Sequence, residues 1–180
     1  MTQRWLYSEA LLDASPSRRD GMTSGEEQRL RCEYCLFMEE CSSNLRLTRL
    51  ACSTGLVLFH RFFSLQSFMA HSGFEVAATC LFLASKVEES AKKLEVVITT
   101  CFGVWYEKTL KTDSEDYAEL RLQILKCERI LLHTLSFDLC VEHPYKFLIE
   151  TVKAVHHANM IQDSQKKDFA QRAVNFLNDR

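Results

Sequence analysis

The sequence predicts an all-helical protein, a five-helix bundle built around one central buried helix. In several segments apolar residues recur at intervals of three and four, which is typical of amphipathic helices. The 180 residues include only 5 glycines and 2 prolines, which disfavours an all-β fold rich in turns. The stretch from Gly73 to Ser90 is small or apolar around nearly its whole circumference, and such a helix belongs at the centre of a bundle.

Composition and charge narrow the class of protein. The net charge of -2 argues against broad nucleic-acid binding, which usually requires a basic surface. No apolar run approaches the roughly 18 residues that a membrane-spanning helix needs, and no secretory signal opens the chain. We therefore expect a soluble intracellular protein, with one domain or one domain plus part of another.

The eight cysteines are scattered, mostly within apolar helical patterns. Cys32 and Cys35 have the spacing of half a metal site, but they fall in the middle of a predicted helix and no second pair follows. We predict no metal and no cofactor, and interpret the other cysteines as small core residues in a reducing compartment, notably Cys52, Cys80, Cys101 and Cys127.

Residues 1–22 have the character of an arm laid on the bundle. Ser8 can cap a short helix, which Pro16 is expected to end because proline lacks a backbone donor. Arg18 and Arg19 are then expected in a loop. They are either a solvated turn or a site that recognises a phosphate or carboxylate.

A capping box, Thr23 with Glu26 or Ser24 with Glu27, predicts the start of the bundle proper. His60 lies in an aromatic helix end, and we interpret it as a buried hydrogen-bonded histidine because no nucleophile stands beside it. The helices of the bundle are expected at residues 23–42, 48–64, 73–90, 91–105 and 116–135.

Two charged positions need an explanation. The central helix ends in Lys86, Glu88 and Glu89, so it must reach the surface there. Glu128 lies in the C-terminal half of its helix, where a carboxylate opposes the helix dipole by a few tenths of a kcal/mol. We therefore expect the Glu128 carboxylate to be bonded to another group.

Residues 136–144 are expected to be an extended linker. Two amphipathic helical patterns follow, at about 144–158 and 164–178. Two helices cannot form a second core, so this region is interpreted as part of a further domain.

Several motifs, in this order, resemble the cyclin box: HRFF, LASKVEES and ERILLHTLSFDL. The arm RWLYSEALLDASPSRRDG and the segment VEHPYKFLIE resemble the cyclin T and cyclin K group. That resemblance implies a first cyclin box at residues 23–139. It further implies that residues 140–180 are a linker and the first two helices of an incomplete second box. Members of this group are nuclear regulatory subunits of kinases that phosphorylate the C-terminal domain of RNA polymerase II.

The resemblance also implies a kinase-binding site. Lys86 and Glu128 match the cyclin lysine and glutamate that bond the backbone around the αC helix of the kinase. Val87, Leu132 and Leu139 match the apolar contacts beside them. Without the resemblance, Lys86 would be read as a cation near a helix C-terminus and Glu128 as half of a surface ion pair.

The chain departs from cell-cycle cyclins at the patch that docks R-x-L substrates. Residues 30–34 correspond to that patch, with Phe37 in place of its tryptophan, and Glu33 introduces a charge that disfavours such docking. Arg31 aligns with an arginine that cell-cycle cyclins pair with an aspartate. His60 occupies the aspartate position, so both are assigned structural roles and the partner of Arg31 is left open.

The leading prediction is a non-catalytic subunit that binds and activates a transcription-type cyclin-dependent kinase. It is expected in the nucleus, without membrane contact and without direct nucleic-acid binding by this segment. The alternatives are a cyclin-fold general transcription factor, similar to the core of transcription factor IIB, a thiol or metal enzyme built on Cys32 and Cys35, and a helical adaptor that activates no kinase.

Overall fold

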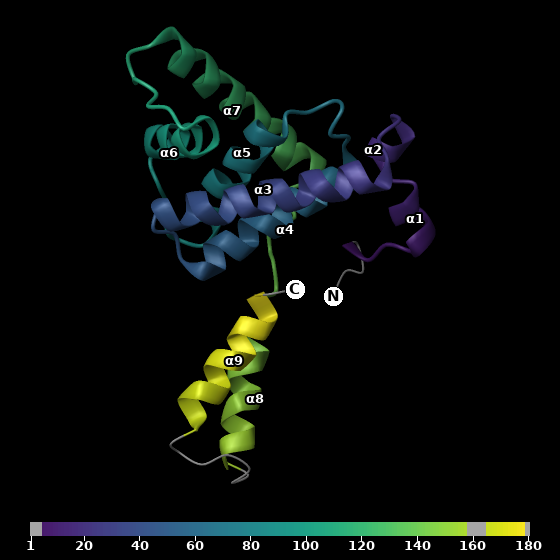
Figure 1. Cartoon of the computed structure of the whole chain (residues 1–180), viewed down its shortest axis with the longest axis vertical. Coiled ribbons are helices and arrows are strands. Elements are labelled where there is room, and N and C mark those ends of the chain that lie inside the picture. Colours follow the sequence, from purple (N-terminus) through teal and green to yellow (C-terminus); the bar gives the residue numbers. More distant parts are fainter. Residues whose placement is uncertain (1–4, 158–164, 179–180) are drawn as a thin grey trace. The chain divides into compact units, whose positions relative to one another are not determined.

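The computed structural model describes residues 5–157 and 165–178, and these form nine α-helices without a strand, which confirms the all-helical prediction (Figure 1). None of the described helices is both long and apolar enough to cross a membrane. The chain divides into two compact units, Met1–Cys140 and Val141–Arg180. The helices are α1 Glu9–Asp13, α2 Pro16–Arg19, α3 Ser24–Asn44, α4 Arg49–Leu65, α5 Gly73–Val87, α6 Leu94–Tyr106, α7 Glu115–Thr134, α8 Tyr145–His157 and α9 Lys166–Asn178.

The arm contains two short helices, where the sequence predicted one helix followed by a loop. Ser8 caps α1 as expected. The expectation that Arg18 and Arg19 lie in a loop is wrong, because Ser15 caps a second helix that contains both, accepting a hydrogen bond from the Arg18 N–H at 3.3 Å. Pro16 is the first residue of α2, a position where a missing N–H costs nothing. Pro16 therefore lies after the end of α1, as predicted, but it also begins a second helix.

The first of the two proposed capping boxes begins α3. The Thr23 hydroxyl accepts from the Glu26 N–H at 3.2 Å, and the Glu26 carboxylate accepts from the Thr23 N–H at 2.9 Å. Because Thr23 and Glu26 form the capping box, Glu27 is not needed for the alternative box with Ser24 and can bond another partner.

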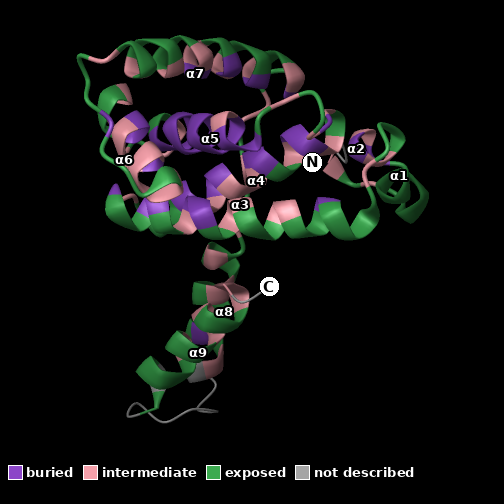
Figure 2. Cartoon of the chain, turned by 45° about the horizontal axis from the view of Figure 1, so that its top comes forward, coloured by how far each residue is buried: buried purple, intermediate pink, exposed green. Residues whose placement is uncertain are grey.

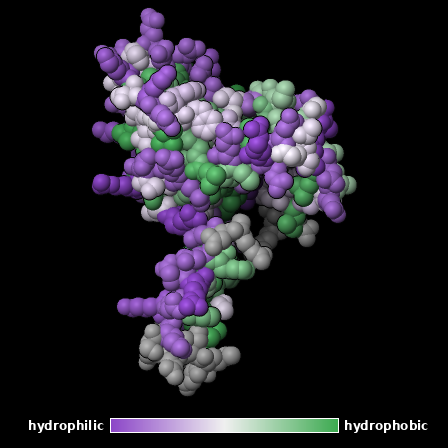
Figure 3. Space-filling view, viewed as in Figure 1, coloured by the Kyte–Doolittle hydropathy of each residue, from purple (hydrophilic) through white to green (hydrophobic). Residues whose placement is uncertain are grey.

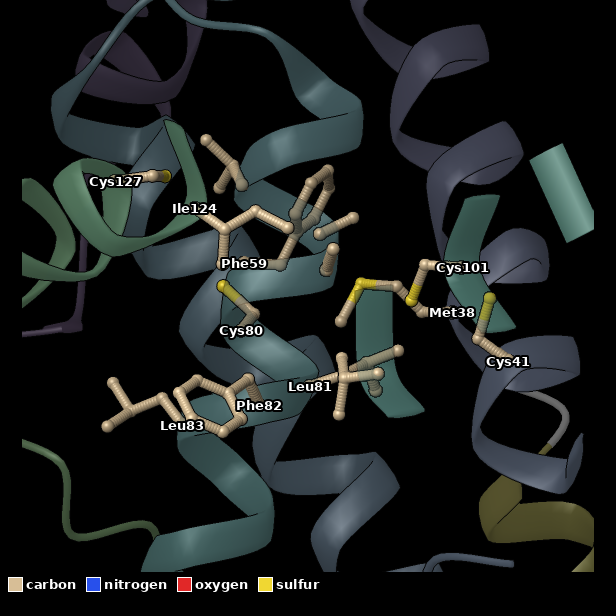
Figure 4. Close-up of a cluster of buried hydrophobic side chains, with 14 of the residues drawn as sticks. Met38, Cys41, Phe59, Cys80, Leu81, Phe82, Leu83, Cys101, Ile124 and Cys127 are labelled. Carbon is tan, nitrogen blue, oxygen red and sulfur yellow. The ribbon is translucent and has the colours of Figure 1, made fainter. Parts of the chain in front are cut away.

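Helix α5 is the centre of the first unit, as predicted. Twelve of its fifteen residues are buried, and the purple colour of α5 in Figure 2 covers nearly its whole length. It packs against α3, α4, α6 and α7. Figure 4 shows side chains from all of these helices gathered around Cys80 and Leu81. The four cysteines predicted to be core residues, Cys52, Cys80, Cys101 and Cys127, are all buried.

An aromatic cluster joins α3 to α6 and to the turn between α4 and α5. The Tyr34 ring stacks on Trp105, with centroids 5.0 Å apart, and lies parallel to Phe68 at 6.2 Å. Phe37 meets Trp105 edge-on, with centroids 5.0 Å apart. Tyr34 also lies directly against the start of α5, where a Cβ atom added to Gly73 would be 2.2 Å from the ring. Close approach of these two helices therefore requires glycine at position 73.

The second unit consists of α8 and α9, which pack against each other. Val152 is buried between them, and the Tyr145 hydroxyl donates to Asn178 Oδ1 at 3.1 Å. Phe147, Ile149 and Phe176 remain exposed. The pair therefore has more apolar surface than two helices can bury.

Replacing Gly73 with alanine should destabilise the first unit by about 1–3 kcal/mol, the usual cost of overpacking a core. The Tyr34 ring cannot move aside because Trp105 and Phe68 confine it. Urea denaturation followed by circular dichroism measures the change. Gly25→Ala is the control, since a Cβ atom there meets nothing within 4 Å and alanine favours the helix. Equal stability of the two variants would contradict the close approach.

Candidate kinase-binding surface

The C-terminal end of α5 brings charge to the surface immediately after the buried part of the helix. The Glu88 N–H bonds to the Ala84 carbonyl at 2.9 Å, and Glu89 then adopts a left-handed conformation with φ 52°, which ends the helix. The Glu88 carboxylate accepts a hydrogen bond from the buried Thr54 hydroxyl at 2.7 Å. Glu88 is thereby held against α4, while Lys86 points to a different neighbour.

Lys86 and Glu128 form an ion pair between α5 and α7. The lysine Nζ also lies 4.0 Å from the centroid of the Phe82 ring, which favours a cation over its face. The Lys86 side chain is 40% exposed and that of Glu128 15%, so a partner can still reach the pair. The partner that Glu128 needs so close to a helix C-terminus is therefore Lys86.

Apolar side chains lie beside this pair. Leu132 is one helical turn after Glu128 and so shares its face of α7. After α7 the Phe137 N–H bonds back to the Leu132 carbonyl at 2.9 Å, which makes a tight turn leading to Leu139. Val87, Leu132 and Leu139 are half-buried against the core. We call the set Lys86, Val87, Glu128, Leu132 and Leu139 the α5–α7 surface.

Phe137 is an exposed aromatic residue that the sequence reasoning missed at this position. It is 62% exposed and its φ is 59°, and the preceding residue Ser136 is also left-handed with φ 52°. Bulky residues rarely adopt this conformation, which costs on the order of 1–3 kcal/mol each and persists where the surrounding structure enforces it. The motif SFDL contained the residue, but only backbone geometry shows that its ring faces solvent.

Arg31 is satisfied mainly by Glu27, a carboxylate that is almost fully buried. Arg31 donates to Glu27 Oε1 through Nη2 at 2.7 Å and through Nε at 3.1 Å, and to the Phe63 carbonyl at 2.9 Å. Ser15 and Arg18, from the arm, donate to the other carboxylate oxygen at 2.7 and 3.2 Å. The carboxylate recognition considered for Arg18 is thus internal, and Glu27 connects the arm to the bundle.

The pKa of Glu27 is lowered from its usual value. Burial alone would raise the pKa, but hydrogen bonds from Ser15 and Arg31 and the charges of Arg31 and Arg18 outweigh it. The carboxylate is therefore ionised in the folded protein at neutral pH.

His60 is hydrogen-bonded as predicted, but the residue as a whole is exposed, so the prediction of a buried histidine is wrong. Its nitrogens lie between Arg31 Nη1, 3.3 Å from Nδ1, and Cys35 Sγ, 3.3 Å from Nε2. Desolvation of these nitrogens, with the Arg31 charge, lowers the pKa of His60 to about 4. Because a guanidinium only donates, Nδ1 accepts and Nε2 donates in the neutral ring.

The thiol of Cys35 is a weak nucleophile in this structure. Burial, with the nearby Cys32 and Glu39, raises the pKa of Cys35 to about 11, so the nucleophilic thiolate is scarce at neutral pH. Within the described part of the chain, no three His, Cys, Asp or Glu side chains are placed to hold a metal ion. His156 and His157 lie at the end of α8, where their side chains are outside the described residues.

A groove of about 590 Å³ separates the arm from α3 and α4. The arm lines it with Trp5, Tyr7, Leu11 and Leu12, and hydrophobic side chains remain exposed on this part of the surface, at the right of Figure 3. The arm is therefore held to the bundle by individual hydrogen bonds and ion pairs rather than by a continuous apolar interface. One of these hydrogen bonds joins the Tyr7 and Ser64 hydroxyls at 2.9 Å.

Comparison with solved structures defines the class of fold. The chain matches a chain in the structure of the CAK complex from Chaetomium thermophilum bound to ATP-gamma-S, with a TM-score of 0.78 and 18% identity, over 96% of this chain and 56% of that one. It also matches a chain of the yeast RNA Pol II CTD kinase CTDK-1 complex, with a TM-score of 0.70 and 18% identity, over 85% of this chain and 49% of that one. The bundle thus has the cyclin-box fold.

Sequence comparison gives the family. Residues 5–140 match the model of the cyclin N-terminal domain, and the chain belongs to the cyclin family. It is 38% identical to Cyclin-T1-2 of Arabidopsis thaliana, over 97% of this chain and 38% of that protein. It is 35% identical both to human Cyclin-K, over 97% of this chain and 29% of that protein, and to Cyclin pch1 of Schizosaccharomyces pombe, over 84% and 45%. The resemblance to T- and K-type cyclins is confirmed, and the chain spans less than half the length of these relatives.

Replacing Glu27 with glutamine should cost about 2–4 kcal/mol at pH 7, because it removes the charge that two arginines share in a buried setting. The pKa of Glu27 is lower in the folded than in the unfolded chain, so its contribution is complete above about pH 4.5 and is lost as the pH falls through the folded value. The stability difference between wild type and Glu27→Gln should therefore narrow below pH 4.5. Urea denaturation at pH 7, 5 and 4 measures it, with exposed Glu33→Gln as the control. A difference that stays constant with pH would contradict the ionised Glu27.

Proposed function

We propose that this chain is a regulatory subunit that binds and activates a transcription-type cyclin-dependent kinase through the α5–α7 surface. The observation that carries the proposal is the exposed Lys86–Glu128 pair, flanked by half-buried apolar side chains, in a chain related to T- and K-type cyclins. The same relationship supports a place of action in the nucleus.

The chemistry of the pair suits a partner's backbone. Lys86 offers ammonium donors and Glu128 offers carboxylate acceptors, so together they can bond both the carbonyl and the N–H groups at a helix end. Each group is already partnered by the other, so neither is left as an unpaired charge before the kinase binds. Such polar groups set the register of an interface, and its apolar core contributes most of the association energy.

Activation then follows from preferential binding. A kinase is active when its αC helix brings a glutamate to the catalytic lysine. A subunit that binds this arrangement more tightly than the inactive one shifts the equilibrium towards it by the difference in affinity. The cyclin needs no catalytic group of its own for this role.

Exchanging the two charges, Lys86→Glu with Glu128→Lys, tests the surface. The exchange keeps an ion pair between α5 and α7 but reverses the charges presented to the kinase, so the fold should remain while binding weakens at least thirtyfold, in line with the 2 kcal/mol or more of a lost buried polar contact. Calorimetric titration of transcription-type and cell-cycle kinases measures it. Lys111→Glu with Glu107→Lys, both exposed in the connection between α6 and α7, is the control.

The outcomes separate the alternatives. Capture of a transcription-type kinase by wild type and by the control, but not by the exchanged variant, supports the proposal. Equal binding by the exchanged variant would show that the α5–α7 surface is wrongly assigned. If no kinase binds wild type, salt-sensitive DNA binding would favour a cyclin-fold transcription factor, and its absence a helical adaptor.

Phe137 should extend this surface. Phe137→Ala is expected to weaken kinase binding about tenfold, since burying an aromatic side chain contributes on the order of 1.5–3 kcal/mol, part of which the alanine retains. Leu122→Ala is the control, because Leu122 is 56% exposed on α7 but precedes Glu128 by almost two turns. Both variants should keep wild-type melting temperatures. Equal affinities of the two variants would remove Phe137 from the proposed interface.

We further propose that residues 140–180 begin a second cyclin box. The exposed apolar faces of α8 and α9 support this, because further helices would cover them. The relatives also extend well beyond the length of this chain.

A further inference from the structure

The turn that leads from α7 to Leu139 is strained and depends on distant residues. Ser136 and Phe137 are consecutive non-glycine residues with φ of 52° and 59°. Four local backbone bonds support the turn, from the N–H groups of Ser136, Phe137, Asp138 and Leu139 to the carbonyls of His133, Leu132, Leu135 and Phe137, at 3.0, 2.9, 3.0 and 3.1 Å. The first three are typical of a helix end, and only the bond from Leu139 reaches into the chain that follows.

Two residues outside α7 hold that following chain. Arg61, on α4, donates through Nη1 to the carbonyls of Asp138 at 3.3 Å and Cys140 at 3.4 Å. Its guanidinium therefore bonds the backbone on both sides of Leu139. Trp5, in the arm, donates its indole N–H to the Asp138 carboxylate at 2.8 Å. The Arg61 guanidinium also lies over the Trp5 ring, 4.7 Å from the centroid. We call Trp5, Arg61 and Asp138 the arm clamp.

We propose that the arm clamp positions the turn that presents Phe137 and Leu139 to the kinase, so that kinase affinity depends on the N-terminal arm. The inference rests on the proposed function of the α5–α7 surface and adds positioning residues to it. Trp5 and Arg61 act here through the turn, without needing to touch the kinase.

The physical reason is preorganisation. If the turn holds its binding conformation for only a fraction of the time, the apparent dissociation constant rises by the inverse of that fraction. The bonds of the clamp join residues that are more than 70 positions apart in the sequence. Their loss therefore frees the turn without breaking a hydrogen bond within a helix.

The test uses Trp5→Phe, which keeps a ring over Arg61 but loses the donor to Asp138, and Arg61→Met, which loses both carbonyl contacts and the cation. Tyr7→Phe is the matched control, because it removes another bond between arm and bundle, the one to Ser64, that does not reach the turn. Amide hydrogen exchange at residues 136–140 is measured in the free chain, with amides of α5 as a check on the fold. Kinase affinity is measured by the same calorimetric titration as above.

We expect exchange at Phe137 and Asp138 to quicken about tenfold in Trp5→Phe and Arg61→Met, with kinase affinity falling by a similar factor. Exchange in α5 should not change, and Tyr7→Phe should match wild type in both measurements.

Three results would overturn the inference. Unchanged exchange at the turn in both variants would show that the clamp does not hold it, whether or not a kinase binds. Weakened affinity with unchanged exchange would mean that Trp5 or Arg61 contacts the kinase directly. Faster exchange with unchanged affinity would mean that binding does not need the ordered turn. If wild type binds no kinase, the proposed function is wrong. The exchange rates in the free chain still show whether the arm clamp orders the turn.

Discussion

The burial of α5 on every side is the constraint on which the first unit depends. A helix that packs against four others carries no charge along its body, so its charged residues lie at its two ends, Glu75 in the first turn and Lys86 in the last. This places Lys86 at the rim of the bundle, next to the half of α7 that carries Glu128. The position of the proposed kinase-binding surface is thus a consequence of how the core is filled. A substitution in the core that shifts α5, such as one at Gly73, would therefore also move Lys86 at the surface.

Glu27 provides the second constraint, because it serves two structural purposes with one carboxylate. One oxygen receives the arm through Ser15 and Arg18, and the other receives Arg31 from its own helix. A carboxylate one turn before Arg31 thereby replaces one at position 60, where this chain has histidine. The histidine then needs only to accept one hydrogen bond from Arg31, which a neutral ring can do.

Much of the fold could be predicted from the sequence because it follows from periodicity and capping. The uniform apolar surface of α5, the Thr23 and Glu26 box and the four buried cysteines are all local patterns. Arg18 was misplaced because Ser15 and Pro16 can either end one helix or begin another, and only the packing of Ser17 against the bundle selects the second. The Glu27 network and the exposure of His60 involve residues from three helices, and Phe137 depends on a left-handed backbone. A one-dimensional pattern contains neither kind of information.

The distribution of the cysteines has a practical consequence for spectroscopy. Of the eight thiols, five are buried in the core and Cys35 is half-buried with a raised pKa, which leaves Cys32 and Cys140 exposed. Thiol-directed dyes at neutral pH should therefore modify chiefly these two positions in the folded chain. Cys140 directly follows Leu139, so with Cys32 replaced by serine a single fluorophore would report on the turn after α7. The native sequence thus already contains an attachment point for a fluorescence sensor of partner binding.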